Sequence, residues 1–68
     1  MEHKIGDLVY NNVYDKLGYI SEYTYVLNSQ GERTRYYKVL WLGTANWEFE
    51  YHEDNINHFK DTLKRKDI

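Results

Sequence analysis

Histidine and acidic residues gather late in the chain and form its most metal-like cluster. His52, Glu53 and Asp54 are consecutive, and His58 follows six positions after His52. The zinc-protease motif places its two histidines four positions apart, on one face of a helix. The spacing here departs from that motif, so the sequence favours a solvated helix start with capping acids. It predicts no metal site and no cofactor.

The residues that serve as catalytic nucleophiles are scarce. The chain has no cysteine, and neither Ser21 nor Ser29 has a histidine beside it in the sequence. The four glycines are isolated, so no glycine-rich loop is present to hold a phosphate group. The sequence therefore predicts that the protein is not an enzyme.

Length and composition predict one small domain over residues 1–68. A chain of 68 residues buries a modest share of its surface, and the lack of cysteine excludes disulfides as a stabilising device. Aromatic residues make up 18% of the chain, with eight Tyr, two Trp and two Phe. These rings supply bulk to a thin core. Self-association is a second route to stability that the sequence permits.

The charge balance narrows the classes of partner and location. The formal net charge is −2, whereas proteins that bind duplex nucleic acid or anionic membranes usually present a basic surface. No apolar run approaches the roughly 20 residues of a membrane span, and residues 1–7 form no apolar signal region. These features predict a cytoplasmic protein that does not bind duplex DNA or membranes.

Alternation of apolar and polar residues predicts the strands. The four predicted strands cover residues 5–11, 19–27, 33–42 and 47–51. In the second strand the inward parity changes after Ile20, which predicts a β-bulge near Ser21 and Glu22. Hairpin turns are predicted over 28–31 and 43–46.

The same alternation assigns side chains to the two faces of the sheet. The predicted core residues are Val9, Ile20, Tyr37, Val39 and Trp41. The last strand alternates three aromatics with two acids, so its aromatic face, Trp47, Phe49 and Tyr51, is predicted to be buried. Leu40 and Leu42 lie on the outer face and are predicted to be covered by the C-terminal segment.

A change of period after Asp54 predicts a short C-terminal helix over about 54–66. Ile56, Phe59 and Leu63 share one helical stripe, and Asp54 is a suitable N-cap. His3, near the N-terminus, is expected to be disordered.

A family resemblance is carried by four segments: Lys4–Val9, Gly18–Ile20, Tyr37–Trp41 and Trp47–Asp54. Their order resembles small SH3-like β-barrel proteins of tailed bacteriophages, mostly uncharacterised, and more loosely Tudor, chromo and KOW modules. The resemblance implies a mainly β fold, an SH3-like small barrel of four to five antiparallel strands over about 4–52. The chain departs from the related modules in two ways: it lacks the basic surface expected of a KOW-type nucleic-acid binder, and its C-terminal helix is not part of the minimal barrel.

The excess of aromatic residues indicates a binding surface, because Tyr and Trp are enriched at interfaces. We therefore expect a non-enzymatic protein–protein interaction module, a phage accessory protein in the host cytoplasm, whose partner is another protein or a second copy. The candidate interaction residues are Tyr10, Tyr14, Tyr19, Tyr23, Trp47 and Tyr51.

Two alternatives remain open at the level of sequence. The first is a nucleic-acid-binding barrel for single-stranded or structured nucleic acid, with Arg33, Arg35 and Lys38 as contacts and nearby tyrosines as a stacking platform. The second is a small-ligand site between copies.

Overall fold

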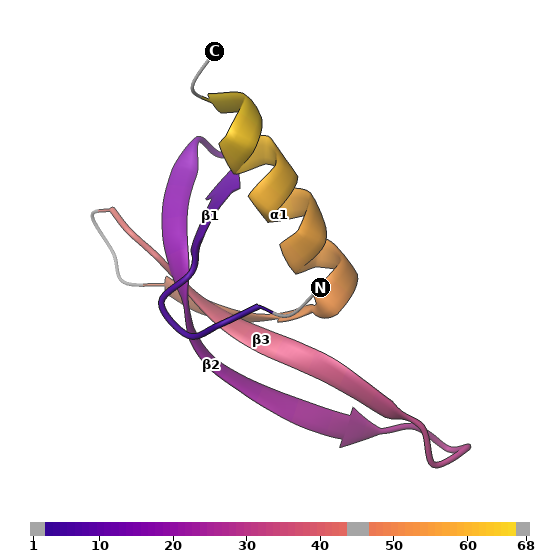
Figure 1. The fold of residues 1–68 in the computed structure, drawn as a ribbon. Helices are drawn as coiled ribbons and strands as arrows, with labels where there is room; N and C mark the ends of the chain where they lie inside the picture. The colour runs from indigo at the N-terminus through magenta and orange to yellow at the C-terminus, as the bar shows by residue number, and fades with distance from the viewer. Residues whose placement is uncertain (1–2, 44–46, 67–68) are drawn as a thin grey trace.

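The structure is a computed structural model that describes residues 3–43 and 47–66. Four strands form one antiparallel sheet in which each strand pairs with the next along the chain, and a single helix follows (Figure 1). The elements are β1 (Leu8–Asn11), β2 (Lys16–Leu27), β3 (Arg33–Trp41), β4 (Trp47–His52) and α1 (Glu53–Lys66). The predicted mainly β fold with a C-terminal helix is therefore confirmed.

The sheet is not closed into a barrel, so the expected SH3-like closure is wrong. In the described part of the chain, β1 and β4 are the two edges of the sheet and do not pair with each other. Helix α1 packs along β1, and the Thr62 hydroxyl donates a hydrogen bond to the Tyr10 carbonyl. The helix thus occupies the edge that a closing strand would need.

The core lies on the inner face of the sheet, beneath the helix. All five predicted core residues are buried, and Ile56 and Phe59 of α1 complete the cluster. The register of β2 against β3 shifts between Ile20 and Glu22, which confirms the predicted bulge. The bulge lets Ile20 and Tyr23 both face inward although their spacing is odd.

The sequence predicted that the C-terminal helix would cover Leu40 and Leu42. This prediction is wrong, because helix α1 packs on the inner face of the sheet. Leu42 remains 44% exposed on the outer face. The chain passes from β4 into α1 without a linker, because β4 ends at His52 and α1 begins at Glu53. Because no loop connects β4 to α1, the helix packs on the inner face of the sheet, where the large apolar side chains of the core lie.

The N-cap of α1 is also different from the prediction. The backbone N–H of Asp54 donates to His52 Nδ1 at 3.0 Å, so His52 caps the helix and Asp54 lies in the first turn. Its carboxylate still suits the positive end of the helix dipole.

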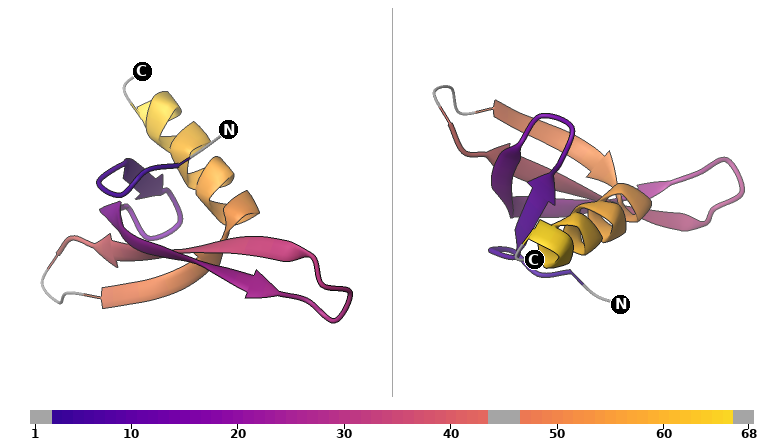
Figure 2. Two further views of the ribbon diagram at one scale, coloured as in Figure 1. Left: turned by 60° about the horizontal axis from the view of Figure 1, so that its bottom comes forward. Right: turned by 90° about the horizontal axis from the view of Figure 1, so that it is seen from above.

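The paired strands β2 and β3 extend past the helix as a long arm. β2 has 12 residues and β3 has 9, and the arm projects away from the helix in every view (Figure 2). The molecule measures 41 × 26 × 20 Å along its principal axes. The tip is the predicted turn after Leu27, where Gly31 adopts a positive φ of 79°.

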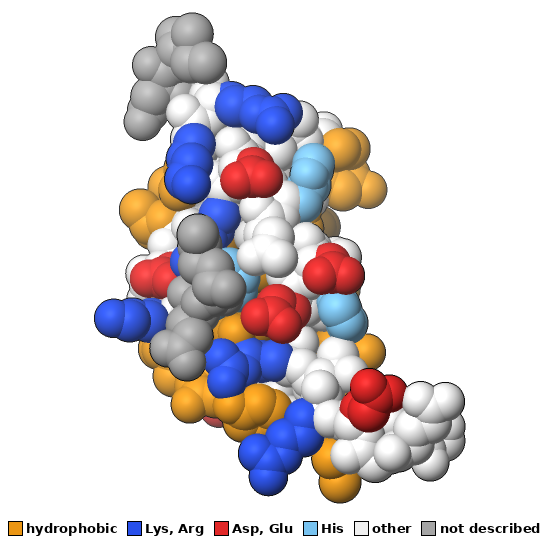
Figure 3. All heavy atoms as spheres, turned by 45° about the vertical axis from the view of Figure 1, so that its right-hand side comes forward, with side chains coloured by type: hydrophobic (Ala, Val, Ile, Leu, Met, Phe, Trp, Pro, Cys, Tyr) orange, Lys and Arg blue, Asp and Glu red, His pale blue; other side chains and the backbone are white. Residues whose placement is uncertain are grey.

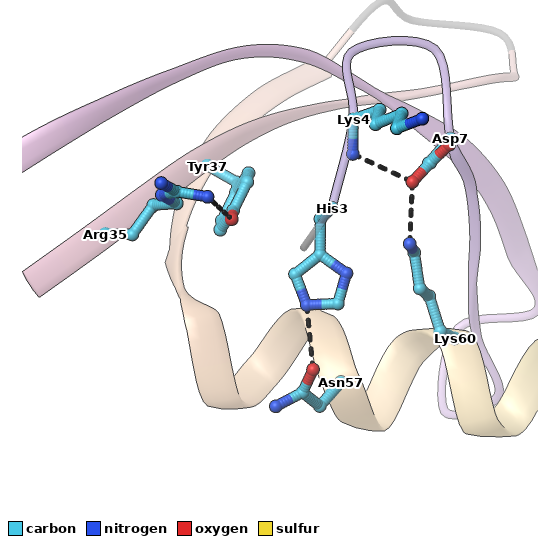
Figure 4. A network of polar contacts seen from close by, with 7 residues as sticks. All are labelled: His3, Lys4, Asp7, Arg35, Tyr37, Asn57 and Lys60. Carbon is cyan, nitrogen blue, oxygen red and sulfur yellow. Dashed lines mark hydrogen bonds and ion pairs between the residues drawn. The ribbon is translucent and has the colours of Figure 1, made fainter. Parts of the chain in front are cut away.

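The N-terminal segment is fastened to the helix, so the expected disorder of His3 is wrong. His3 is 4% exposed, its ring lies edge-on to Tyr37 at 5.3 Å, and its Nε2 lies 2.7 Å from Asn57 Oδ1. Nearby, Lys60 Nζ pairs with Asp7 Oδ2 at 2.6 Å (Figure 4). Among the residues that the structure describes, none forms a hydrogen bond with the buried His3 Nδ1.

Trp41 is the largest side chain of the core, and its truncation tests the packing. We expect Trp41→Ala to lower the free energy of unfolding by about 3–5 kcal/mol, because the lost ring leaves a cavity. Trp47→Ala, the matched control on an exposed site, should change it by less than about 0.5 kcal/mol. Chemical denaturation measures both, and equal losses in the two variants would contradict the assignment of Trp41 to the core.

Burial of His3 predicts a pH dependence of stability. Desolvation, reinforced by the Lys60 charge, lowers the pKa of His3 below its ordinary value of 6.5, although Asn57, Glu53 and Asp7 act in the opposite direction. The unfolded state therefore binds a proton first as pH falls, so the free energy of unfolding should decrease below pH 6.5.

Denaturation of His3→Gln at a series of pH values provides the comparison. Gln does not titrate, so the decrease in the free energy of unfolding that His3 causes below pH 6.5 should be absent from the variant. Hydrogen bonds from Lys60 and Lys4 lower the pKa of Asp7 below 3.8, and its contribution is lost only in that more acidic range. A decline of equal size in His3→Gln above that range would assign the effect to another group.

Candidate interaction surface

An aromatic groove opens on the inner face of the sheet beyond the end of the helix cover. It has a volume of about 460 Å³ and is lined by Asn11, Tyr14, Lys16, Trp41, Trp47, Phe49 and Tyr51. Trp47 is 58% exposed, Phe49 52% and Tyr14 73%. The predicted burial of Trp47 and Phe49 is therefore wrong, although both lie on the predicted face.

The strand register places these rings on the inner face. Trp47 pairs with Trp41, Phe49 with Val39 and Tyr51 with Tyr37, and directly paired residues share one face of a sheet. The face of β4 thus continues the core, but only its last aromatic, Tyr51, lies next to the helix.

The helix cover ends at Tyr51 in a chain of ring contacts. The Phe59 ring lies 5.0 Å from Tyr51 and 5.3 Å from Trp41, and Trp41 Nε1 donates to the Tyr51 hydroxyl at 3.0 Å. Further along β4, Phe49 and Trp47 contact each other edge-on at 6.3 Å. Among described residues, the ring contact of Trp47 and Phe49 is with each other, and both side chains remain more than half exposed.

The loop between β1 and β2 forms the far wall of the groove. Asn11 Oδ1 accepts hydrogen bonds from the backbone N–H groups of Val13 and Tyr14, at 2.9 and 3.3 Å. This turn, typical of Asn, holds the Tyr14 segment above the sheet. Asp15 follows with a positive φ of 52° and accepts a hydrogen bond from the Tyr10 hydroxyl.

The outer face of β4 is acidic. Glu48 and Glu50 are exposed there, and Ser21 Oγ donates to Glu48 Oε2 at 2.7 Å. Lys38, on the neighbouring strand, pairs with Glu22 at 3.1 Å. The hydrogen bond with Glu22 raises the pKa of Lys38, and the negative charges of Glu48 and Glu50 raise it further.

The arm carries a second, cationic surface. The Arg35 guanidinium lies 4.8 Å from the Tyr25 ring centre and 5.4 Å from that of Tyr23, while Arg33 lies 5.5 Å from Tyr25. Basic side chains lie among hydrophobic ones near the lower end of the face in Figure 3. Arg35 also donates to the Tyr37 hydroxyl at 3.3 Å, so the arm holds its cations on rings.

The predicted site residues do not form one surface. Tyr14, Trp47 and Tyr51 meet in the groove, whereas Tyr10 and Tyr19 lie on the outer face, and Tyr23 lies on the arm. This division follows from the alternation of side chains along β1 and β2.

The predicted nucleic-acid contacts are divided as well. Arg33 and Arg35 face inward, and Lys38 faces outward beside Glu22. One nucleic-acid backbone could therefore not contact all three side chains along a single face of the sheet.

Four groove residues escaped the sequence prediction: Asn11, Lys16, Trp41 and Phe49. Phe49 could have been found, because it shares the parity of Trp47 and Tyr51 in β4. Among described residues, no three His, Asp or Glu side chains gather closely enough to hold a metal ion. At the start of α1, His52 Nδ1 accepts the hydrogen bond from the Asp54 backbone N–H.

Comparisons with protein-family models, with curated proteins and with solved structures find no match to this chain. In the described residues, α1 is neither long nor apolar enough to cross a membrane.

The openness of the groove predicts binding of an apolar dye. Trp47→Ala combined with Phe49→Ala should reduce the fluorescence of anilinonaphthalene sulfonate, because the exposed apolar area falls. The free energy of unfolding should change little, as is usual for surface sites. Leu42→Ala, an exposed apolar residue on the outer face, is the control and should leave dye fluorescence unchanged. An equal loss of dye fluorescence in the groove variant and in Leu42→Ala would show that the dye does not bind in the groove.

Proposed function

We propose that this protein is a non-enzymatic protein–protein interaction module that binds its partner through the aromatic groove. The observation that carries the proposal is the exposure of Trp47 and Phe49 on the core face of the sheet. Exposed apolar patches of this kind mark interaction sites, and aromatic rings supply much of the energy at interface centres. The partner is another protein or a second copy of this chain.

The polar lining of the groove supports binding in preference to catalysis. Asn11 and Lys16 are its polar residues, and the Asn11 side chain already serves the turn to Tyr14. The described lining residues include no acid–base or nucleophile–base pair.

The biological setting is part of the proposal. We propose a phage accessory protein acting in the host cytoplasm, on the basis of the resemblance to small SH3-like proteins of tailed bacteriophages. The open edge at β4 is a departure from that resemblance, and it leaves more of the inner face available to a partner.

Nucleic-acid binding is the second candidate, and the arm is the observation that favours it. Arg33 and Arg35 lie against tyrosine rings that could also stack on exposed bases. The net charge of −2 and the separation of Lys38 from these arginines speak against a long electrostatic contact.

A matched pair of variants tests the first proposal. Purified protein serves as bait in a pull-down from bacterial lysate, and light scattering measures its own mass. Trp47→Ala with Phe49→Ala should abolish the captured partner or the self-association, while Tyr19→Ala on the outer face should preserve it. Capture or self-association that survives in the groove variant contradicts the proposal.

Fluorescence anisotropy tests the second candidate. We expect no binding to duplex DNA at physiological salt, because phosphate neutralisation supplies most of the non-specific affinity. The nine basic residues of this chain are outnumbered by eleven acidic ones and are divided mainly between the hairpin, around Arg33 and Arg35, and the tail, around Lys64–Lys66. A single-stranded oligonucleotide of about 16 nucleotides covers the alternative. Salt-sensitive binding to it that is lost in Arg33→Ala with Arg35→Ala would favour a nucleic-acid-binding function.

A further inference from the structure

Strand β4 has a free edge next to the groove. In the described part of the chain, β4 pairs with β3 along one side and with no strand along the other. An unpaired edge presents backbone N–H and C=O groups that another chain can pair with. Such pairing is a recurrent mode of peptide recognition.

We propose that β4 binds an extended segment of another protein as a fifth strand, and that this segment alternates apolar and basic residues. The inference rests on the proposed protein-binding function and specifies its partner. The two faces of β4 set the chemistry of the segment, because side chains of an added strand alternate between the same two faces.

The inner face selects the apolar residues. Side chains of an added strand that point inward would lie beside Trp47 and Phe49, which are more than half exposed. The groove continues from these rings to Tyr14 and has about 460 Å³ to receive them. Burial of apolar side chains against these rings stabilises the complex.

The outer face selects the basic residues. Glu48 and Glu50 point outward from β4, and Glu48 accepts a hydrogen bond from Ser21. Lys38 lies directly opposite Glu50 but forms its ion pair with Glu22 at 3.1 Å, so one cation faces three carboxylates. Opposite charges in directly paired positions of a sheet are favourable, and like charges are unfavourable. An added strand with lysine or arginine in its outward positions meets this requirement.

The same charges disfavour pairing between two copies of β4. Antiparallel pairing that keeps the aromatic faces together must pair outward residues with outward residues. Glu48 would then lie opposite Glu48, Glu50 or His52 of the second copy. When Glu48 lies opposite His52, Glu50 lies opposite Glu50. Each of these three registers therefore places acids opposite acids, so we assign the edge to a different protein.

Synthetic peptides of about six residues, a common strand length, test the proposal. One peptide alternates lysine and valine, a second alternates glutamate and valine, and a third has the lysines and valines of the first in two blocks. We expect the first alone to bind saturably and to shift and protect the backbone amides of β4 in NMR spectra. Equal binding by the block peptide, or shifts confined to the arm, would overturn the proposal.

N-methylation tests whether the peptide is paired as a strand. In an extended strand the N–H groups of alternate residues point to opposite edges. Methylation of the backbone nitrogens of all lysines, or of all valines, therefore removes the backbone hydrogen bonds to β4 in one case and leaves them in the other. We expect one methylated peptide to lose binding and the other to keep it. The same effect of both modifications would contradict strand addition.

A charge reversal tests the outer face. Glu50→Lys should weaken the lysine–valine peptide by about threefold to tenfold, as expected for an exposed ion pair turned into a repulsion. Asp61→Lys makes the same change of charge at an exposed site on α1 and should leave the affinity unchanged. Circular dichroism confirms that both variants fold. Equal weakening in both would show a non-specific charge effect and overturn the assignment of the outer face.

The outcome separates this inference from the proposed function. If partner capture depends on Trp47 and Phe49 but neither N-methylation nor Glu50→Lys affects peptide binding, the groove binds a partner and the strand-addition inference is wrong. If the groove variant keeps all its partners, the proposed function fails first.

Discussion

The packing of one 14-residue helix on a sheet longer than itself is the constraint on which the structure depends. Ile56 and Phe59 bury the centre of the inner face, and Thr62 binds the edge at β1. The helix also holds His3 through Asn57. Over residues 3–43 and 47–66, this small domain has no second helix or layer with which to cover the rest of the inner face.

Two uncovered ends of the inner face result from this constraint, and they differ in chemistry. Beyond Phe59, the end at β4 presents open aromatic rings with acids on the opposite face. In the other direction, the arm presents Arg33 and Arg35 on tyrosine rings. Rings that already hold cations suit a structural arm. Rings that contact each other and lie more than half exposed beside a free edge suit a binding site.

Residue alternation was sufficient to predict the strands, the bulge after Ile20 and the buried face of β3. It could not predict how far the helix cover would reach, so Trp47 and Phe49 were wrongly assigned to the interior. Barrel closure depends on which edges meet in space, and no periodicity records that. The burial of His3 was also missed, because a lone histidine near a terminus carries no pattern that distinguishes a core position from a disordered one.

Hydrogen exchange of the two tryptophan indole N–H groups, followed by NMR, tests the central claim that the cover ends between these rings. The Trp41 indole donates to Tyr51 within the core, whereas Trp47 lies more than half exposed. We expect slow exchange at Trp41 and exchange at Trp47 close to the rate of a free indole. Comparable protection of both groups in the monomeric protein would contradict the claim, because it would mean that Trp47 is covered without a partner.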